Sequence, residues 1–265
     1  MNIAVCFKVE PKLETMQKDD WIVNNNKVDT SFLIDEISLI DESALEIGLR
    51  IKDENPSTIL KAITVNKTST LIKNLYSLNY DEIIQINNEE EINFYPEIAA
   101  NLIAAYLKKL DEKQDIIIMG QKSLVGYNSK TPYVLSELIN YPCISEVTEI
   151  KVDKENNTLI VQSNSDFGNM IQTVTPPCIL SLGNVQNSYL RLPTLREKLK
   201  AKKKEVTKIE VNKLIDNSLL KAIKENYELI ELSKVNTDRE GIIIDGDNMA
   251  SKVTTLFRDY LKDNL

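Results

Sequence analysis

The order of apolar and polar residues divides the first 140 positions into alternating strands and helices. Short apolar runs bounded by turn residues are typical of buried strands, and apolar residues at three- and four-residue spacing are typical of helices. The predicted strands span residues 2–7, 58–65, 83–86 and 115–120. The predicted helices span residues 41–53, 68–78, 96–110 and 131–139. This alternation predicts a mostly parallel, doubly wound α/β sheet with right-handed crossovers.

Two regions depart from this alternation, one after the first strand and one after residue 140. Residues 10–35 are polar and irregular, with a small hairpin predicted near Trp21. Four short segments separated by Asn, Asp and Gly turns predict an antiparallel extension of the same sheet. They span residues 147–152, 158–162, 171–175 and 179–182.

The C-terminal part differs again. It has fewer apolar residues per turn, a polar linker at 233–240, an apolar run at 241–244 that predicts a strand, and a predicted helix at 248–262. We therefore divide the chain into an α/β domain at 1–205 and a C-terminal arm at 206–265, which we expect to pack on its own domain or on another subunit.

Composition narrows the function. The 265-residue chain contains no histidine, which removes His-based triads and the commonest zinc ligand sets. Its net charge of −8 opposes non-specific nucleic-acid binding. No apolar stretch is long enough for a membrane span and no secretory signal is visible. With three isolated cysteines in apolar contexts, these features predict a cytoplasmic protein that has no metal site.

Positive charge is concentrated in one segment. Residues 191–208 hold eight Lys or Arg and two Glu, a charge of about +6, which leaves about −14 for the rest of a chain whose total is −8. Two interpretations stand side by side: a solvated surface helix, and a contact for an acidic partner.

A ligand crevice is expected at the carboxyl ends of the parallel strands, where open α/β sheets bind their ligands. These ends are residues 7–9, 65–67 and 120–123, and the last continues as a polar loop to Thr131. Backbone N–H groups at a helix N-terminus favour an anion such as phosphate, and Lys122 and Lys130 add positive charge. A plain connecting loop is the alternative, because the chain has neither a Rossmann fingerprint nor a P-loop.

The carboxylates at Asp41, Glu42 and Glu46 begin a predicted helix. Asp41 is placed to cap it, and acidic residues in a first turn favour the helix dipole. Capping is the preferred interpretation over paired-carboxylate catalysis.

Several segments, in order, resemble the beta subunit of electron-transfer flavoproteins. Residues 3–11 resemble that family's first strand and its Lys-x-Val-Pro turn, and residues 37–46 its Asp-Glu-x-Ala-Leu-Glu helix start. Residues 115–131 resemble the strand and nucleotide loop, and residues 176–182 the late Pro-apolar strand. The most specific match is residues 191–204, similar to the Arg-x-Pro-Ser-Leu segment and its following Ala-Lys-Lys-Lys.

Residues 239–247 look most like the branch linked to carnitine metabolism and nitrogen fixation. The resemblance implies a fold like that of adenine-nucleotide alpha-hydrolases and universal-stress proteins. It implies an electron carrier, not a catalyst by itself, in a heterodimer with an alpha subunit that holds FAD. It further implies AMP, or a second FAD, in the crevice of this chain. An acyl-CoA dehydrogenase-type or quinone oxidoreductase partner would dock near Leu195.

The resemblance assigns roles to particular residues. The expected nucleotide-binding residues are Phe7, Lys8, Val9, Ser38, Asp41, Val65, Asn66, Gly120, Gln121, Lys122, Ser123, Gly126, Tyr127, Asn128, Ser129, Lys130 and Thr131. The expected partner-docking residues are Arg191, Leu192, Pro193, Thr194, Leu195, Arg196 and Lys198.

The chain departs from the family at Ser38, Asn66, Val125, Tyr127 and Lys130, where Asn, Gly, Asp, an acidic residue and Gln are common. Three interpretations follow: a carrier subunit with its nucleotide, a stand-alone nucleotide-binding module of the universal-stress type, and a degenerate scaffold subunit without nucleotide.

Overall fold

The structure is a computed structural model, which describes residues 1–66, 71–88, 92–185, 189–235 and 241–262. Within these residues one nine-stranded sheet forms the centre, in the order β11-β10-β9-β12-β8-β1-β6-β7-β13. The strands from β9 to β13 in this order run parallel to their neighbours. The central strands are β1 (Asn2–Cys6), β6 (Ile59–Asn66), β7 (Glu82–Asn87), β8 (Ile116–Gly120) and β12 (Cys178–Leu182). The predicted doubly wound α/β fold is confirmed.

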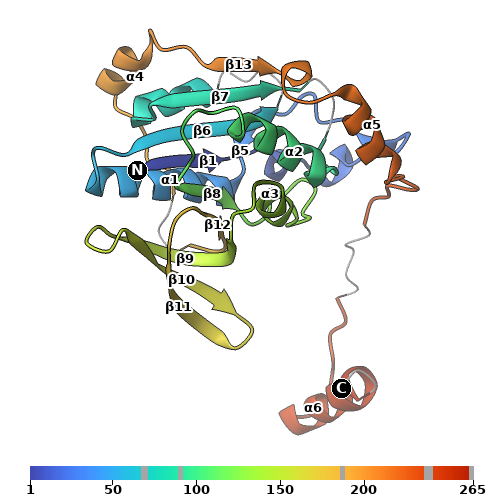
Figure 1. Cartoon of the computed structure of the whole chain (residues 1–265). Coiled ribbons are helices and arrows are strands. Elements are labelled where there is room, and N and C mark those ends of the chain that lie inside the picture. Colours follow the sequence, from blue (N-terminus) through green and yellow to red (C-terminus); the bar gives the residue numbers. More distant parts are fainter. Residues whose placement is uncertain (67–70, 89–91, 186–188, 236–240, 263–265) are drawn as a thin grey trace.

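Helices cover both faces of the sheet. One face carries α1 (Leu39–Glu54), the 3-10 helix η3 (Leu71–Leu78) and α4 (Leu195–Ala201), and the other carries α2 (Pro96–Leu107), α3 (Thr131–Ile139) and α5 (Asn217–Glu225). Figure 1 shows α2 and α3 side by side in front of the sheet.

The sequence of β1 explains this two-sided packing. Successive side chains of a strand point to opposite faces, so Ile3 and Val5 enter one core while Ala4 and Cys6 enter the other. Buried on both faces, β8 carries a continuous apolar run, as parallel strands do.

The antiparallel extension consists of β9 (Cys143–Asp153), β10 (Thr158–Ser165) and β11 (Gly168–Val174). One part of that prediction is wrong: residues 178–182 form β12, which runs parallel to both β8 and β9. Its burial gives the reason, since all five residues of β12 are buried and belong to the central, helix-covered part of the sheet.

Residues 9–37 form small elements beside the main sheet. β2 (Val9–Pro11) pairs with β5 (Asp35–Ile37), and two 3-10 turns, η1 (Leu13–Thr15) and η2 (Lys18–Asp20), follow β2. The hairpin expected near Trp21 is formed by β3 (Val23–Asn24) and β4 (Lys27–Val28). Its turn residues Asn25 and Asn26 have φ values of 51° and 57°, as a tight hairpin turn of primed type requires.

The C-terminal arm begins inside the sheet. β13 (Thr207–Glu210) pairs in parallel with β7, and α5 packs on α2 after the short turn η4 (Val211–Lys213). The division at 205/206 thus falls between α4 and β13, a strand of the main sheet, and the two-domain description stays a prediction.

The last part of the chain lies apart from the sheet in Figure 1, where α6 (Met249–Leu256) and the π-helical turn η5 (Phe257–Leu261) fall within the helix predicted at 248–262. The strand predicted at 241–244 is wrong. These residues form no helix or strand: among the described residues they pair with no strand of the sheets, and Ile243 is exposed. Part of the predicted linker, and the start of the helix predicted at 68–78, lie outside the described residues. Among the helices described, none combines the length and apolar character needed to cross a membrane.

Candidate functional site

The topological switch point lies between β1 and β8. From β1 the chain passes through α1 to β6 on one side, while β8 pairs with β1 on the other. Because Cys6 and Met119 are register partners, residues 7–8 and 120–122 leave the sheet next to one another. The expected crevice residues at these two strand ends are therefore brought together. Val65 and Asn66 end the neighbouring strand β6, and Phe7 is buried in the core rather than facing the crevice.

Asp41 links the two strand ends. Its carboxylate accepts hydrogen bonds from the backbone N–H of Lys8 and of Gly120, each at 2.8 Å. A Cβ at Gly120 would lie 2.5 Å from Asp41 Oδ1, so only glycine leaves room for this carboxylate. Asp41 does not cap the helix as predicted: α1 already begins at Leu39, with Ser38 as the cap residue, which donates its backbone N–H to Lys8 O at 3.0 Å.

The electrostatics of Asp41 follow from its position. Burial raises the pKa of the Asp41 carboxyl to about 7, against the lowering effect of its two backbone hydrogen bonds. Both oxygens are used within the chain, which agrees with a structural role for this carboxylate rather than with acid–base catalysis.

Glu10 is the crevice residue that the sequence did not single out. Its side chain is 2% exposed, and its carboxylate accepts the backbone N–H groups of Leu124 (3.4 Å) and Val125 (3.2 Å) in the crevice loop. Lys8 Nζ lies 3.8 Å from the same carboxylate and donates to Val125 O at 2.6 Å and to Ser123 Oγ at 3.3 Å. Glu10 belongs to a short polar stretch without periodicity, so nothing in the sequence pattern indicated that its side chain would be buried against the loop.

The rest of the loop is tightly wound. Gly126, Tyr127 and Ser129 all have positive φ, and a Cβ at Gly126 would clash with the backbone carbonyl of Asn93. The side chain of Asn128 accepts the backbone N–H of Lys130 at 3.1 Å, just before Thr131 starts α3.

Three more of the polar side chains expected to contact a nucleotide, those of Gln121, Lys122 and Lys130, have partners within the chain. Lys122 Nζ stacks 4.5 Å from the centre of the Tyr127 ring, and Lys130 Nζ lies 3.9 Å from Glu97. Gln121 turns toward the sheet, where it accepts a hydrogen bond from Ser181 Oγ and donates to the Tyr133 hydroxyl. Val9 pairs with Ile37 in the small β2–β5 sheet.

The segment expected to dock a partner forms an exposed apolar stripe. Leu192, Leu195 and Leu199 are 91%, 74% and 63% exposed, and the last two lie one helical turn apart on α4. Thr194 caps this helix: its side chain accepts from Glu197 N, while the Glu197 carboxylate accepts from Thr194 N at 2.6 Å. Pro193 precedes the cap, and Arg196 and Lys198 are exposed on the helix. We call residues 192–199 the docking segment.

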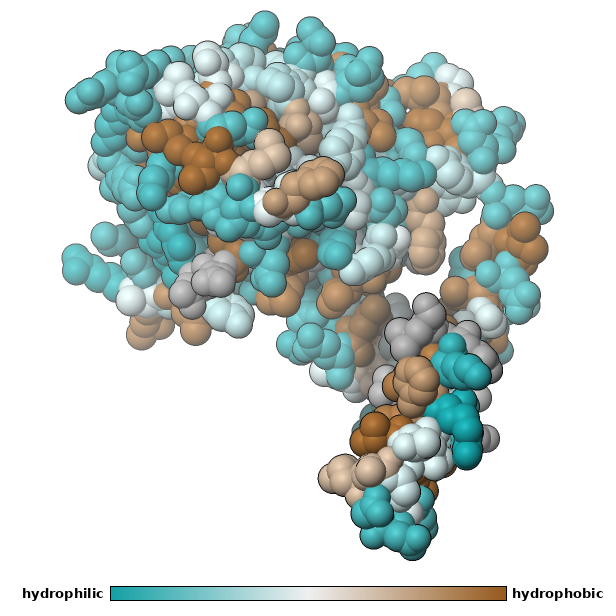
Figure 2. Space-filling view, turned by 90° about the horizontal axis from the view of Figure 1, so that it is seen from below, coloured by the Kyte–Doolittle hydropathy of each residue, from teal (hydrophilic) through white to brown (hydrophobic). Residues whose placement is uncertain are grey.

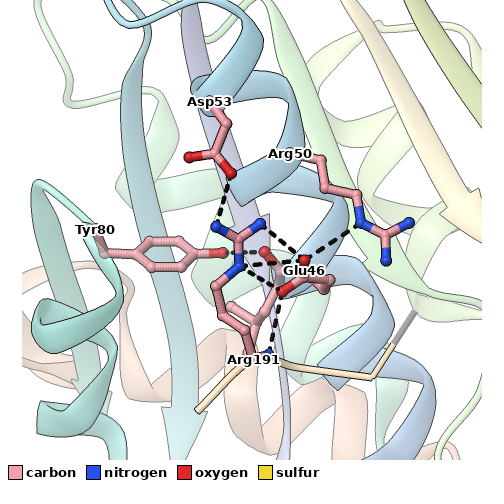
Figure 3. Close-up of polar contacts among 6 residues, drawn as sticks. Glu46, Arg50, Asp53, Tyr80 and Arg191 are labelled. Carbon is pink, nitrogen blue, oxygen red and sulfur yellow. Dashed lines mark hydrogen bonds and ion pairs between the residues drawn. The ribbon is translucent and has the colours of Figure 1, made fainter. Parts of the chain in front are cut away.

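Arg191 anchors this segment instead of facing outward. Figure 3 shows its guanidinium between Glu46 and Asp53 of α1, with Nη2 at 2.8 Å from Glu46 Oε1 and Nη1 at 2.7 Å from Asp53 Oδ2. Arg50 also reaches Glu46, at 3.3 Å, and the buried Tyr80 hydroxyl beside them donates to Leu45 O. Burial opposes ionisation of Glu46, but the hydrogen bonds and charge of Arg191 outweigh it and lower the pKa of this carboxyl.

The three cysteines are buried or partly buried and lack the features of reactive thiols. Burial raises the pKa of Cys178 to about 12 and that of Cys143 to about 11, so both remain protonated thiols at neutral pH. Cys6 is buried and its pKa is raised further. Over the part of the chain that the structure describes, no group of three Cys, Asp or Glu side chains is placed to hold a metal ion.

Comparison with known proteins connects this geometry to one family. The profile described as "Electron transfer flavoprotein domain" matches residues 33–214. The chain is 24% identical over 270 residues to the putative electron transfer flavoprotein subunit YgcR of Escherichia coli, covering 100% of this chain and 99% of that protein.

Two further relatives match over part of their length. The electron transfer flavoprotein subunit beta of Bacillus subtilis is 23% identical, with 81% of this chain and 80% of that protein covered. The caffeyl-CoA reductase–Etf complex subunit CarD of Acetobacterium woodii is 25% identical, with 68% of each covered. Because the family profile spans most of its length, the chain belongs to the electron transfer flavoprotein family.

Proposed function

We propose that this chain is the beta subunit of a heterodimeric electron-transfer flavoprotein and that an alpha subunit holds the redox FAD. The family and the full-length similarity to YgcR support the electron-transfer role. The bound FAD would accept and release the electrons, while the protein supplies orientation and electrostatics. This chain then needs surfaces that brace a partner rather than a general base, which agrees with its lack of histidine.

One observation carries the heterodimer proposal: the C-terminal extension, residues 241–262, exposes many large apolar side chains. They are Ile242, Ile243, Met249, Val253, Leu256, Phe257, Tyr260 and Leu261. Figure 2 shows brown, apolar residues along this extension at the lower right, beyond the body of the molecule. So many exposed apolar side chains on one short segment are typical of a protein–protein interface. In our proposal the extension wraps the alpha subunit.

The docking segment is the proposed contact for the electron donor or acceptor. Its exposed leucines provide an apolar anchor, and the basic residues around them fit an acidic surface. We propose an acyl-CoA dehydrogenase-type or quinone oxidoreductase partner. The name of CarD, which assigns that relative to a caffeyl-CoA reductase complex, supports a partner that acts on acyl-CoA compounds. The three free cysteines, Cys6, Cys143 and Cys178, agree with the cytoplasmic location that we propose.

The resemblance also implies a nucleotide in the crevice, AMP or a second FAD, and the residues there test whether it fits. The crevice loop offers backbone N–H donors and Lys8, which suit a phosphate, but these groups already contact Glu10. The residues present therefore do not fit a phosphate group in this arrangement.

The proposed function is tested by co-expressing the chain with the alpha-type subunit of its own organism. We expect a 1:1 complex with a flavin absorbance spectrum and FAD released on denaturation. A colourless complex, or no complex, would contradict the proposal. A homodimer that binds ATP tightly without a partner would favour the universal-stress type of module instead.

A further inference from the structure

We propose that the carboxylate of Glu10 occupies the phosphate position of the crevice and so excludes a nucleotide from this chain. This inference rests on the proposed function and adds that the crevice of this subunit holds no nucleotide. It does not depend on the alpha subunit or its flavin. It makes Glu10 the residue that determines whether this fold binds a nucleotide.

The donors around Glu10 are those that would bind a phosphate. Two consecutive backbone N–H groups, from Leu124 and Val125, point to its two carboxylate oxygens, and the Lys8 ammonium lies 3.8 Å from one of them. Consecutive N–H groups and a lysine are a recurrent set of ligands for phosphate oxygens. Glu10 therefore supplies from within the chain the negative charge that this loop is built to hold.

The backbone keeps Glu10 in place. It lies in the middle of β2, whose residues Val9 and Pro11 pair with Ile37 and Asp35 of β5. Its side chain is buried, and withdrawing it would leave a charged carboxylate without its hydrogen-bond donors, which is costly. A phosphate would have to displace a group that the small sheet holds against the loop.

The charge around the position also opposes a second anion. Asp41 is buried at the neighbouring strand ends, so a nucleotide phosphate would enter beside two carboxylates, Glu10 and Asp41. Like charges at short distance disfavour one another strongly in a buried site. Lys122 and Lys130, the residues expected to offset such charge, contact Tyr127 and Glu97.

The first test measures the nucleotide content of the wild-type heterodimer. The complex is denatured, and FAD and AMP are counted by chromatography against protein concentration. We expect one FAD per heterodimer and no AMP. One AMP, or a second FAD, per heterodimer would overturn the inference while leaving the proposed function intact, whereas a complex without flavin would contradict only the proposed function.

The second test removes the Glu10 carboxylate from the proposed phosphate position. Calorimetric titration of the full-length chain with AMP, FAD and inorganic phosphate compares the wild type with Glu10→Ala. We expect AMP binding at least tenfold tighter in E10A. Glu36→Ala is the matched control, because Glu36 is the register partner of Glu10 in β5 but pairs with Lys12 instead of the loop. Equal AMP affinity in E10A and the wild type would overturn the inference.

A third variant covers the case in which E10A does not fold. Glu10→Gln keeps an oxygen acceptor for the loop and removes the charge, and we expect it to bind AMP more tightly than the wild type. An E10Q protein that melts as the wild type does and gains no AMP affinity would count against the charge argument. The nucleotide content of the wild type decides the matter even if neither variant can be purified.

Discussion

The crevice and the docking segment use charged residues in opposite ways. At the crevice, the charges of Lys8, Glu10 and Asp41 contact backbone and side-chain groups of the same chain. At the docking segment, Arg191 just before it is held by Glu46 and Thr194 caps the helix, while Leu192, Leu195 and Leu199 are left exposed. In the crevice, which resembles a ligand site, the charged groups are thus used by the chain itself. The docking segment instead leaves its side chains available to another protein. Substitutions at the first should cost stability, and substitutions at the second should cost association.

The largest effect is expected from removing the C-terminal extension. Ending the chain at residue 240 deletes the exposed apolar residues but keeps β13 and α5, which pack on the sheet. Losing even two buried apolar anchors costs about 3 kcal/mol, a loss of affinity on the order of a hundredfold for the alpha subunit. Sedimentation measures the affinity, and thermal melting of the isolated chain should be unchanged. Full co-purification of the shortened chain would reject the wrapping role.

Gly120→Ala should destabilise the closed region. The new methyl group would meet Asp41 Oδ1, and overpacking of this kind costs about 2 kcal/mol. Urea unfolding measures the loss, with Gly241→Ala as the control because a Cβ there has no neighbour within 4 Å. Equal stability of the two variants would show that Asp41 does not hold the strand ends together.

Arg191→Ala should weaken the anchor of the docking segment. It leaves the buried Glu46 without its main partner, and since Arg191 is partly exposed we expect a loss of about 2 kcal/mol in unfolding free energy. Folding lowers the pKa of Glu46 from its ordinary value of 4.5. The contribution of the ion pair to stability is therefore present above pH 4.5 and is lost as the pH falls through the lower pKa of the folded state. Urea titrations at several pH values measure it, and the exposed Arg196→Ala is the control. A difference that does not shrink in acid would contradict the ion-pair explanation.

Leu195→Ala should have the smallest effect and only on function. Its side chain is exposed, so the fold should be unchanged, while loss of one apolar anchor should slow electron transfer to the partner dehydrogenase about tenfold. Stopped-flow flavin oxidation with the complete heterodimer measures the rate. The control is Leu124→Ala at an exposed leucine of the crevice loop, which should leave the rate unchanged. Equal rates in both variants would remove the docking role of Leu195.

Local pattern was enough to predict the central fold and the strands whose ends lie side by side. Apolar runs such as 116–119 and the start of α3 at Thr131 depend on neighbouring residues, which a sequence displays directly. The contacts that decide each site join distant positions. Glu10 meets the loop 114 residues later, and Arg191 meets Glu46 across 145 residues.

The errors have the same origin. The direction of β12 and the missing strand at 241–244 depend on which neighbours are present, not on the residues themselves. Asp41 looked like a helix cap because capping is a local role for that residue type. In the structure its carboxylate instead holds two strand ends that are far apart in sequence.

A single helix, α1, contacts both the strand ends at the crevice and the base of the docking segment. Asp41 in its first turn fixes the strand ends, and Glu46 and Asp53 further along hold Arg191 at the base of the docking segment. Asp53 follows Asp41 by twelve positions, which at a rise of about 1.5 Å per residue separates them by about 18 Å along the helix axis. A partner that binds at the leucines is therefore joined, through Arg191 and α1, to the residue that holds the two strand ends.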